Sequence, residues 1–215
     1  MKPSAYRWLF CSLALVGFAV DQGSKYGVFH ALYRGAEEGE IDLLPGIFKL
    51  WVKYSSQRDP GDLPLSWLRV IGDAPLPQVN HGALFGLASE HGYDANLFFT
   101  VVSLAAGLAI IVWITRTSAA RDAFLTVALG LILAGTMGNL FDRLVFGGVR
   151  DFLYFYLINW PVFNVADCCL VCGAGLLLLQ AFFAPSPLPE PATQTAAGTL
   201  AQQPDAQQPD VVQMK

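Results

Sequence analysis

The sequence predicts an all-α integral membrane protein with four transmembrane helices, and three observations support this prediction. Of the 215 residues, 54% are hydrophobic and only 14% are charged, with a mean hydropathy of +0.45. A soluble protein of this size needs more polar surface. Four apolar segments approach the roughly 20 residues needed to cross a bilayer. A polar cluster lies at 138–167, where buried carboxylates cost roughly 2.5–3.5 kcal/mol each on insertion, so it is a candidate functional site.

The first predicted span covers about residues 6–32. Its basic start and the apolar run that follows also resemble a secretory signal peptide. The segment continues to Asp21 and Lys25, which would have no role in a removed peptide, so we expect an uncleaved helix. The other three spans are predicted at about 95–115, 123–141 and 161–183.

These spans form one predicted membrane domain, residues 1–184, with a long connection at about 33–93. The alternating run IFKLWVKY in this connection predicts a short, half-buried strand. The stretch that follows, about 54–78, is rich in Pro, Gly and Asp and is expected to be an extended loop. Residues 185–215 repeat AQQPD and cannot bury a core, which predicts a disordered tail.

An even number of crossings places both termini on one side of the membrane, and the short-loop charges slightly favour the cytoplasm. The candidate polar residues then fall in one layer on the opposite side. They are Asp21 in span one, Asn80 before span two, Asn139 and Asp142 in span three, and Asn164 and Asp167 at the start of span four. Asp151 can reach the same layer from a glycine-containing turn.

Two carboxylates held close in a low-dielectric site share a proton, because both cannot ionise easily. The ionised carboxylate can take a proton from water while the protonated one donates to a carbonyl oxygen. Such a pair can hydrolyse an amide with no metal and no cofactor. The structural alternative is a set of ion pairs that joins Asp142 to Arg143 and Asp151 to Arg150.

Other site classes are less consistent with the sequence. The net charge of −4 argues against a nucleic-acid partner, which requires a basic face. A zinc site needs three or four converging ligands, whereas the three histidines are scattered and the C-x-x-C pair at 169–172 lies in an apolar run. We therefore expect no metal site.

Five short motifs occur in order along about residues 5–183. They are DQGSK at 21–25, NHGALF at 80–85, GNLFDR at 138–143, GVRDF at 148–152 and FNVAD at 163–167. In this order they resemble the motifs of signal peptidase II, the lipoprotein signal peptidase. The resemblance implies an intramembrane aspartic endopeptidase that removes signal peptides from bacterial prolipoproteins, cutting before a diacylglyceryl-modified cysteine.

The resemblance also implies roles for individual residues. Asp151 and Asp167 match the catalytic aspartates of the family. The residues that match the lining of its site are Asn80, Asn139, Arg143 and Asn164. The residues that we assign to structural pairing near the site are Asp21, Lys25 and Asp142, although the depth and spacing of Asp142 also suit catalysis.

The implied architecture is a monomer with four helices and a small extracytoplasmic β cradle. Both termini, including the tail, would be in the cytoplasm, and the site would open to lipid near the outer face of the bacterial inner membrane. The expected partners are diacylglyceryl prolipoprotein signal peptides and membrane lipid. This chain departs from the family in the longer insert at about 54–78, the tail, and Leu84 within the second motif.

Two other functions use the same carboxylates. A small proton-coupled transporter would relay protons through them, but it would need polar residues along a whole pathway, and spans two and three have few. A membrane transferase would use Asp142, Asp151 and Asp167 as Mg²⁺ ligands.

Overall fold

The computed structural model describes residues 3–33, 37–55, 64–69, 75–82, 92–116, 120 and 122–183. All structural statements below concern these residues. The predicted tail at 185–215 and much of the predicted insert at 54–78 lie outside them.

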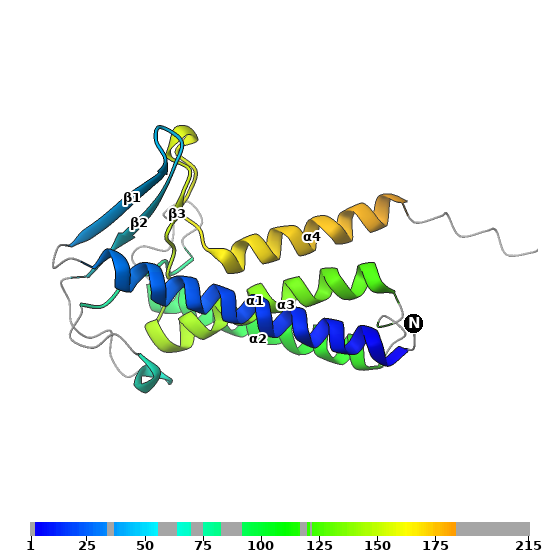
Figure 1. Ribbon diagram of the computed structural model, residues 1–215. Helices are drawn as coiled ribbons and strands as arrows, with labels where there is room; N and C mark the ends of the chain where they lie inside the picture. Colours follow the sequence, from blue (N-terminus) through cyan, green and yellow to red (C-terminus); the bar gives the residue numbers. More distant parts are fainter. Residues whose placement is uncertain are drawn as a thin grey trace, which may run out of the picture. The chain divides into compact units, whose positions relative to one another are not determined.

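Four long α-helices dominate the structure (Figure 1). They are α1 (Pro3–Leu32), α2 (Gly92–Arg116), α3 (Ala123–Phe146) and α4 (Val165–Phe183). Helix α3 contacts each of the other three helices, and 56% of its most apolar stretch is buried. The corresponding shares for α2 and α4 are only 6% and 11%. The outer helices thus expose apolar side chains, as expected for helices that face lipid.

Three helices are long and apolar enough to cross a membrane among the described residues, namely Ala95–Arg116, Ala123–Phe146 and Val165–Phe183. The predicted first span at about 6–32 is not among them, although α1 is 30 residues long. Its polar residues Asp21, Gln22 and Lys25 lower its hydropathy. Their side chains are 0%, 8% and 0% exposed, so they face other protein elements. The structure therefore confirms a mostly helical membrane protein, and it shows three candidate spans among the described residues where four were predicted.

The helix ends differ from the predicted spans for local reasons. Helix α3 continues to Phe146, past the predicted 141, and stops at Gly147, whose φ of 79° is left-handed and suits glycine. Helix α4 begins at Val165 and not at 161, because Phe163 pairs with Leu153 as extended backbone. Asp122 caps the start of α3 by accepting from two backbone N–H groups.

The strands form one antiparallel sheet in the order β1–β2–β3. They are β1 (Glu38–Leu44), β2 (Phe48–Lys53) and β3 (Leu153–Tyr154). The run IFKLWVKY was predicted as a strand, and it contains β2. The sheet brings the first extended connection beside the segment between α3 and α4, as Figure 1 shows.

One face of the sheet packs on the end of α1. Val52 and Phe152 form a buried cluster with Phe29 and Leu32 of that helix. Tyr54 joins the same cluster, and its hydroxyl donates a hydrogen bond to Phe29 O. This contact fixes β2 and the segment that follows β3 against the helices.

The helices approach closely through glycines, as is common in membrane bundles. A Cβ added at Gly135 would lie 2.3 Å from Ala166 O, and one at Gly138 would lie 2.5 Å from Asp21 Oδ2. Neither position has room for a side chain. These glycines let α3 touch both α4 and α1.

We predict that Gly138→Ala lowers the stability of the protein by about 1–3 kcal/mol, because the added methyl group would displace the Asp21 carboxylate. The thermal unfolding midpoint in detergent measures this effect. Gly23→Ala on α1 is the control, since an added Cβ there has nothing within 4 Å. Equal midpoints for the two variants would contradict the prediction.

Candidate active site

Two aspartates meet at one asparagine. Asp151 lies in the segment between α3 and β3, and Asp167 lies in the first turn of α4. The side-chain amide of Asn164 donates to Asp151 Oδ1 over 2.6 Å, and the Asn164 backbone N–H donates to Asp167 Oδ2 over 3.1 Å. A single residue therefore orients both carboxylates.

The start of α4 explains the spacing of Asn164 and Asp167. Asn164 Oδ1 accepts from the Asp167 N–H over 3.0 Å, while Asp167 accepts from the Asn164 N–H. This reciprocal pair is a capping box, which satisfies free N–H groups at a helix start. The sequence carries its signal, Asn-x-x-Asp before an apolar run, which our sequence analysis did not use.

Each aspartate also accepts from a second side-chain amide. Asn80 Nδ2 donates to Asp151 Oδ2 over 3.0 Å, and Asn139 Nδ2 donates to Asp167 Oδ1 over 2.8 Å. Two backbone hydrogen bonds of 2.8 Å to Val149 hold Asn80 in place. Because asparagine is neutral, these residues orient the carboxylates without cancelling their charge.

The surroundings of Asp151 favour its protonated form. Burial among protein atoms, followed by the nearby negative charge of Asp167, raises the pKa of Asp151 to about 7. The hydrogen bonds from Asn80 and Asn164 act in the opposite direction, but they are smaller. A carboxyl group that titrates near neutral pH can act as a general acid.

A buried ionic cluster lies next to the two aspartates. It consists of Asp21, Lys25, Asp142 and Arg150, and each residue is 0% exposed. Lys25 Nζ is 2.8 Å from Asp21 Oδ2 and 3.2 Å from Asp142 Oδ2, and Arg150 Nη2 is 2.9 Å from Asp142 Oδ1. Two positive and two negative charges balance in this cluster, which limits the cost of burying them.

The cluster corrects the ion pairs that we considered as a structural alternative. Asp142 pairs with Lys25 and Arg150, and not with its sequence neighbour Arg143. Arg150 pairs with Asp142, and not with its neighbour Asp151. Consecutive residues of a helix point in different directions, so Asp142 and Arg143 cannot face each other.

Gln22 contacts this cluster, and neither Gln22 nor Arg150 was predicted as a site residue. Arg150 Nη2 donates to Gln22 Oε1 over 2.9 Å, and Gln22 Nε2 donates to Asp142 Oδ1 over 3.1 Å. The Arg150 guanidinium also lies 4.2 Å and 4.0 Å from the ring centres of Tyr26 and Phe146. The available signal was the presence of both residues within the motifs DQGSK and GVRDF.

Three links join the ionic cluster to the aspartate pair. Lys25 Nζ donates to Asn139 Oδ1 over 3.4 Å, and Asn139 holds Asp167. Asp21 Oδ1 accepts from the N–H of residue 166 in the first turn of α4, over 2.8 Å. The backbone N–H of residue 150, next to Asp151, donates to Asp142 Oδ2 over 2.9 Å. The cluster therefore positions both aspartates through their neighbours.

Arg143 lies one helical turn beyond Asn139. Its Nη1 donates to Asn139 O over 3.3 Å, and its guanidinium is 5.3 Å from the ring centre of Phe99. Its Nε is buried and has no hydrogen-bond partner among the described residues. The Arg143 guanidinium thus lies near the pair, within range of the charges of Asp151 and Asp167.

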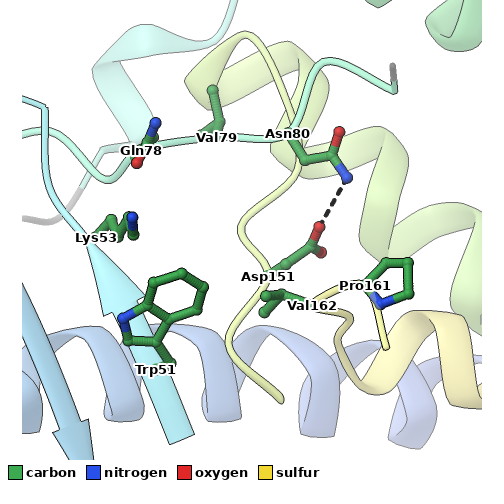
Figure 2. A pocket seen from close by; sticks show the side chains of 8 residues that line it. All are labelled: Trp51, Lys53, Gln78, Val79, Asn80, Asp151, Pro161 and Val162. Carbon is green, nitrogen blue, oxygen red and sulfur yellow. Dashed lines mark hydrogen bonds between the residues drawn. The ribbon is translucent and has the colours of Figure 1, made fainter. Parts of the chain in front are cut away.

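A cavity of about 290 Å³ opens beside Asp151 (Figure 2). The residues that line it are Trp51, Lys53, Gln78, Val79, Asn80, Asp151, Pro161 and Val162. The cavity gives a ligand access to one of the two aspartates.

The three aspartates considered as Mg²⁺ ligands do not converge. Asp142 is engaged with Lys25 and Arg150, whereas Asp151 and Asp167 are joined through Asn164. Across the described part of the chain, no group of three His, Cys, Asp or Glu side chains is arranged to hold a metal ion.

Known proteins resemble this chain in sequence. The family model described as signal peptidase (SPase) II matches residues 76–183. A lipoprotein signal peptidase of Rhodopirellula baltica is 36% identical over 188 residues, covering 81% of this chain and 71% of the relative. A lipoprotein signal peptidase of Pseudoalteromonas translucida is 39% identical over 188 residues, covering 86% and 94%.

Solved structures resemble the fold. Two solved structures, each described as a bacterial membrane enzyme, superpose with TM-scores of 0.57 and 0.58, at 22% and 21% sequence identity. The first match covers 81% of this chain and 88% of the solved chain, and the second covers 82% and 94%. The relatives and the family model together establish that this chain belongs to the signal peptidase II family, the lipoprotein signal peptidases.

Proposed function

We propose that this protein is an intramembrane aspartic endopeptidase that removes signal peptides from diacylglyceryl-modified bacterial prolipoproteins, cutting before the lipidated cysteine. Asp151 and Asp167 are its catalytic pair. The observation that carries the proposal is the shared asparagine, since Asn164 donates to both carboxylates at once. Membership of the family supports the substrate class.

The two aspartates divide acid and base roles. Asp151, with its pKa raised to about 7, holds a proton and donates it to the carbonyl oxygen of the scissile amide. Asp167 takes a proton from the attacking water. The tetrahedral intermediate then collapses: the C–N bond breaks, the proton on Asp167 passes to the leaving nitrogen, and one hydroxyl proton returns to Asp151 as the carbonyl re-forms. The products are a carboxylic acid and an amine, with no covalent enzyme intermediate.

Supporting residues keep this geometry. Asn80, Asn139 and Asn164 orient the carboxylates, and the positive charge of Arg143 lies within range of both. The ionic cluster of Asp21, Lys25, Asp142 and Arg150 holds the elements that carry them.

In this proposal α1 is a fourth, uncleaved span. At 30 residues and 1.5 Å per residue it is roughly 45 Å long, enough to cross a hydrocarbon core of about 30 Å. Its buried polar residues contact α3 and not lipid. Both termini and the tail at 185–215 lie in the cytoplasm. The sheet and the aspartates lie near the outer face of the inner membrane, and the protein acts as a monomer.

We predict that Asp151→Asn and Asp167→Asn each reduce cleavage of a diacylglyceryl prolipoprotein by at least about 10²-fold, because each removes one partner of the acid–base pair. Cleavage by purified protein in detergent micelles measures this, and Asp42→Asn on exposed β1 is the matched control. Cleavage at the parent rate by both catalytic variants would contradict the assignment.

The same assay separates the peptidase from the Mg²⁺-dependent alternative. We expect cleavage to continue unchanged in EDTA, because the proposed chemistry uses only protein carboxylates and water. Loss of cleavage in EDTA, restored by added Mg²⁺, would favour the alternative in which these aspartates bind Mg²⁺.

The raised pKa of Asp151 also predicts a pH-dependent stability. An aspartate titrates near 3.8 in the unfolded chain but near 7 here, so the folded state binds more protons between these values. Stability should therefore fall as the pH rises from about 4 to 7. Unfolding midpoints in detergent should fall less steeply for Asp151→Asn, whereas Asp42→Asn keeps the parent slope. The same pH dependence of the unfolding midpoint in all three proteins would refute the raised pKa of Asp151.

A further inference from the structure

The wall of the cavity opposite Asp151 is made by β2. Trp51 and Lys53 project from the same face of this strand, because side chains alternate along it, and the intervening Val52 is buried against α1. Figure 2 shows these two side chains on one side of the cavity and Asp151 with Asn80 on the other.

Contacts with β1 hold this wall in place. Lys53 pairs with Glu38 in the register of the sheet, and Lys53 Nζ is 3.1 Å from Glu38 Oε1. Lys53 Nζ also lies 4.4 Å from the Trp51 ring centre, and Trp51 Nε1 donates to Glu38 Oε2 over 3.3 Å. The ammonium group remains accessible, since the Lys53 side chain is 37% exposed.

The third wall comes from the end of the insert. The Gln78 N–H donates to Lys53 O over 2.9 Å, and the Ser55 N–H donates to Leu76 O over 2.8 Å. Residues 76–78 therefore run beside the end of β2 and lead directly to Asn80, which donates a hydrogen bond to Asp151. The cavity wall and the proposed catalytic pair are therefore parts of one connected structure.

The position of the cavity indicates which part of the substrate reaches it. The signal peptide before the cleaved bond is apolar and stays with the membrane helices. The chain after the lipidated cysteine belongs to a secreted protein and must leave the bilayer. The residues that line the cavity come from β2, from residues 78–80 and from the segment between α3 and α4, and not from the four long helices; they include charged and amide side chains.

We propose that this cavity is the subsite for the residue that directly follows the lipidated cysteine, with Lys53 as a specificity-determining residue. The subsite favours small acidic or polar side chains over basic ones. This inference rests on the proposed peptidase function. A volume of about 290 Å³ is sufficient for a side chain of this size with its backbone.

Charge explains the preference. An acidic side chain can approach the Lys53 ammonium group on the wall away from the catalytic pair. A basic side chain would be repelled there and drawn instead toward Asp151, where it would favour the ionised carboxylate and remove the proton that the reaction needs. Glu38 partly neutralises Lys53, so the preference is moderate, at about two- to five-fold for an exposed charge pair.

The test uses three synthetic diacylglyceryl prolipopeptides that differ only in the residue after the cysteine, which is Asp, Ala or Lys. The measured quantity is kcat/KM in detergent micelles, and the Ala peptide serves as the reference for overall activity. We expect the parent protein to cleave the Asp peptide about two- to five-fold better than the Lys peptide.

Lys53→Glu should reverse this ratio, and Lys53→Met should bring it close to one while keeping much of the contact with Trp51. Lys49→Glu is the matched control. Lys49 lies on the same face of β2, pairs with Glu40 and contacts the same Trp51 ring, but it does not line the cavity. Lys49→Glu makes the same charge change as Lys53→Glu, and it should leave the Asp-to-Lys peptide ratio as in the parent.

An equal ratio in the parent and Lys53→Glu, or equal changes in Lys53→Glu and Lys49→Glu, would overturn the subsite while leaving the peptidase proposal intact. Failure of the parent protein to cleave any of the three peptides would instead overturn the peptidase function and the subsite with it. If Lys53→Glu loses activity on all three peptides, the ratio in Lys53→Met decides.

Discussion

The rest of the structure depends on the ion pairs that the fully buried carboxylate of Asp142 forms. This carboxylate faces Lys25 of α1 and Arg150 of the segment after α3, and all three side chains are excluded from solvent. A charge buried at this depth is stable only when it is paired and hydrogen-bonded. The pairing therefore forces α1 and the segment that carries Asp151 to dock on α3 in one arrangement.

The geometry of the candidate active site follows from this docking. Arg150 precedes Asp151, so anchoring its backbone and side chain on Asp142 sets where the first aspartate lies. Asp21, paired with Lys25, accepts from the first turn of α4, which carries the second aspartate. The resulting site is held by helix ends and buried charges and does not rely on loop conformation alone. Such support gives the precision that acid–base chemistry requires.

Much of this arrangement could be predicted, and the errors have clear physical causes. Helical crossings and hydropathy placed Asp21, Asn139 and Asp167 in one layer. In the structure Asn139 donates to Asp167, and Asp21 accepts from the N–H of residue 166 in the same turn of α4. The structural alternative that paired Asp142 with its sequence neighbour Arg143 was wrong, because consecutive residues of a helix point in different directions and the partners of Asp142 come from other elements. The capping box at Asn164 could have been recognised, since its signal is local.

The sequence by itself determined the class of protein, the helical segments, the strand at β2 and most of the polar residues of the site, because these depend on composition, periodicity and local motifs. Its ordered motifs also identified the family. Only the tertiary structure decided which charges neutralise each other, that Asn164 joins Asp151 to Asp167, and that Trp51 and Lys53 form a wall facing Asp151. These contacts join residues far apart in the chain, and their partners depend on how helices and strands pack, which hydropathy and spacing do not specify.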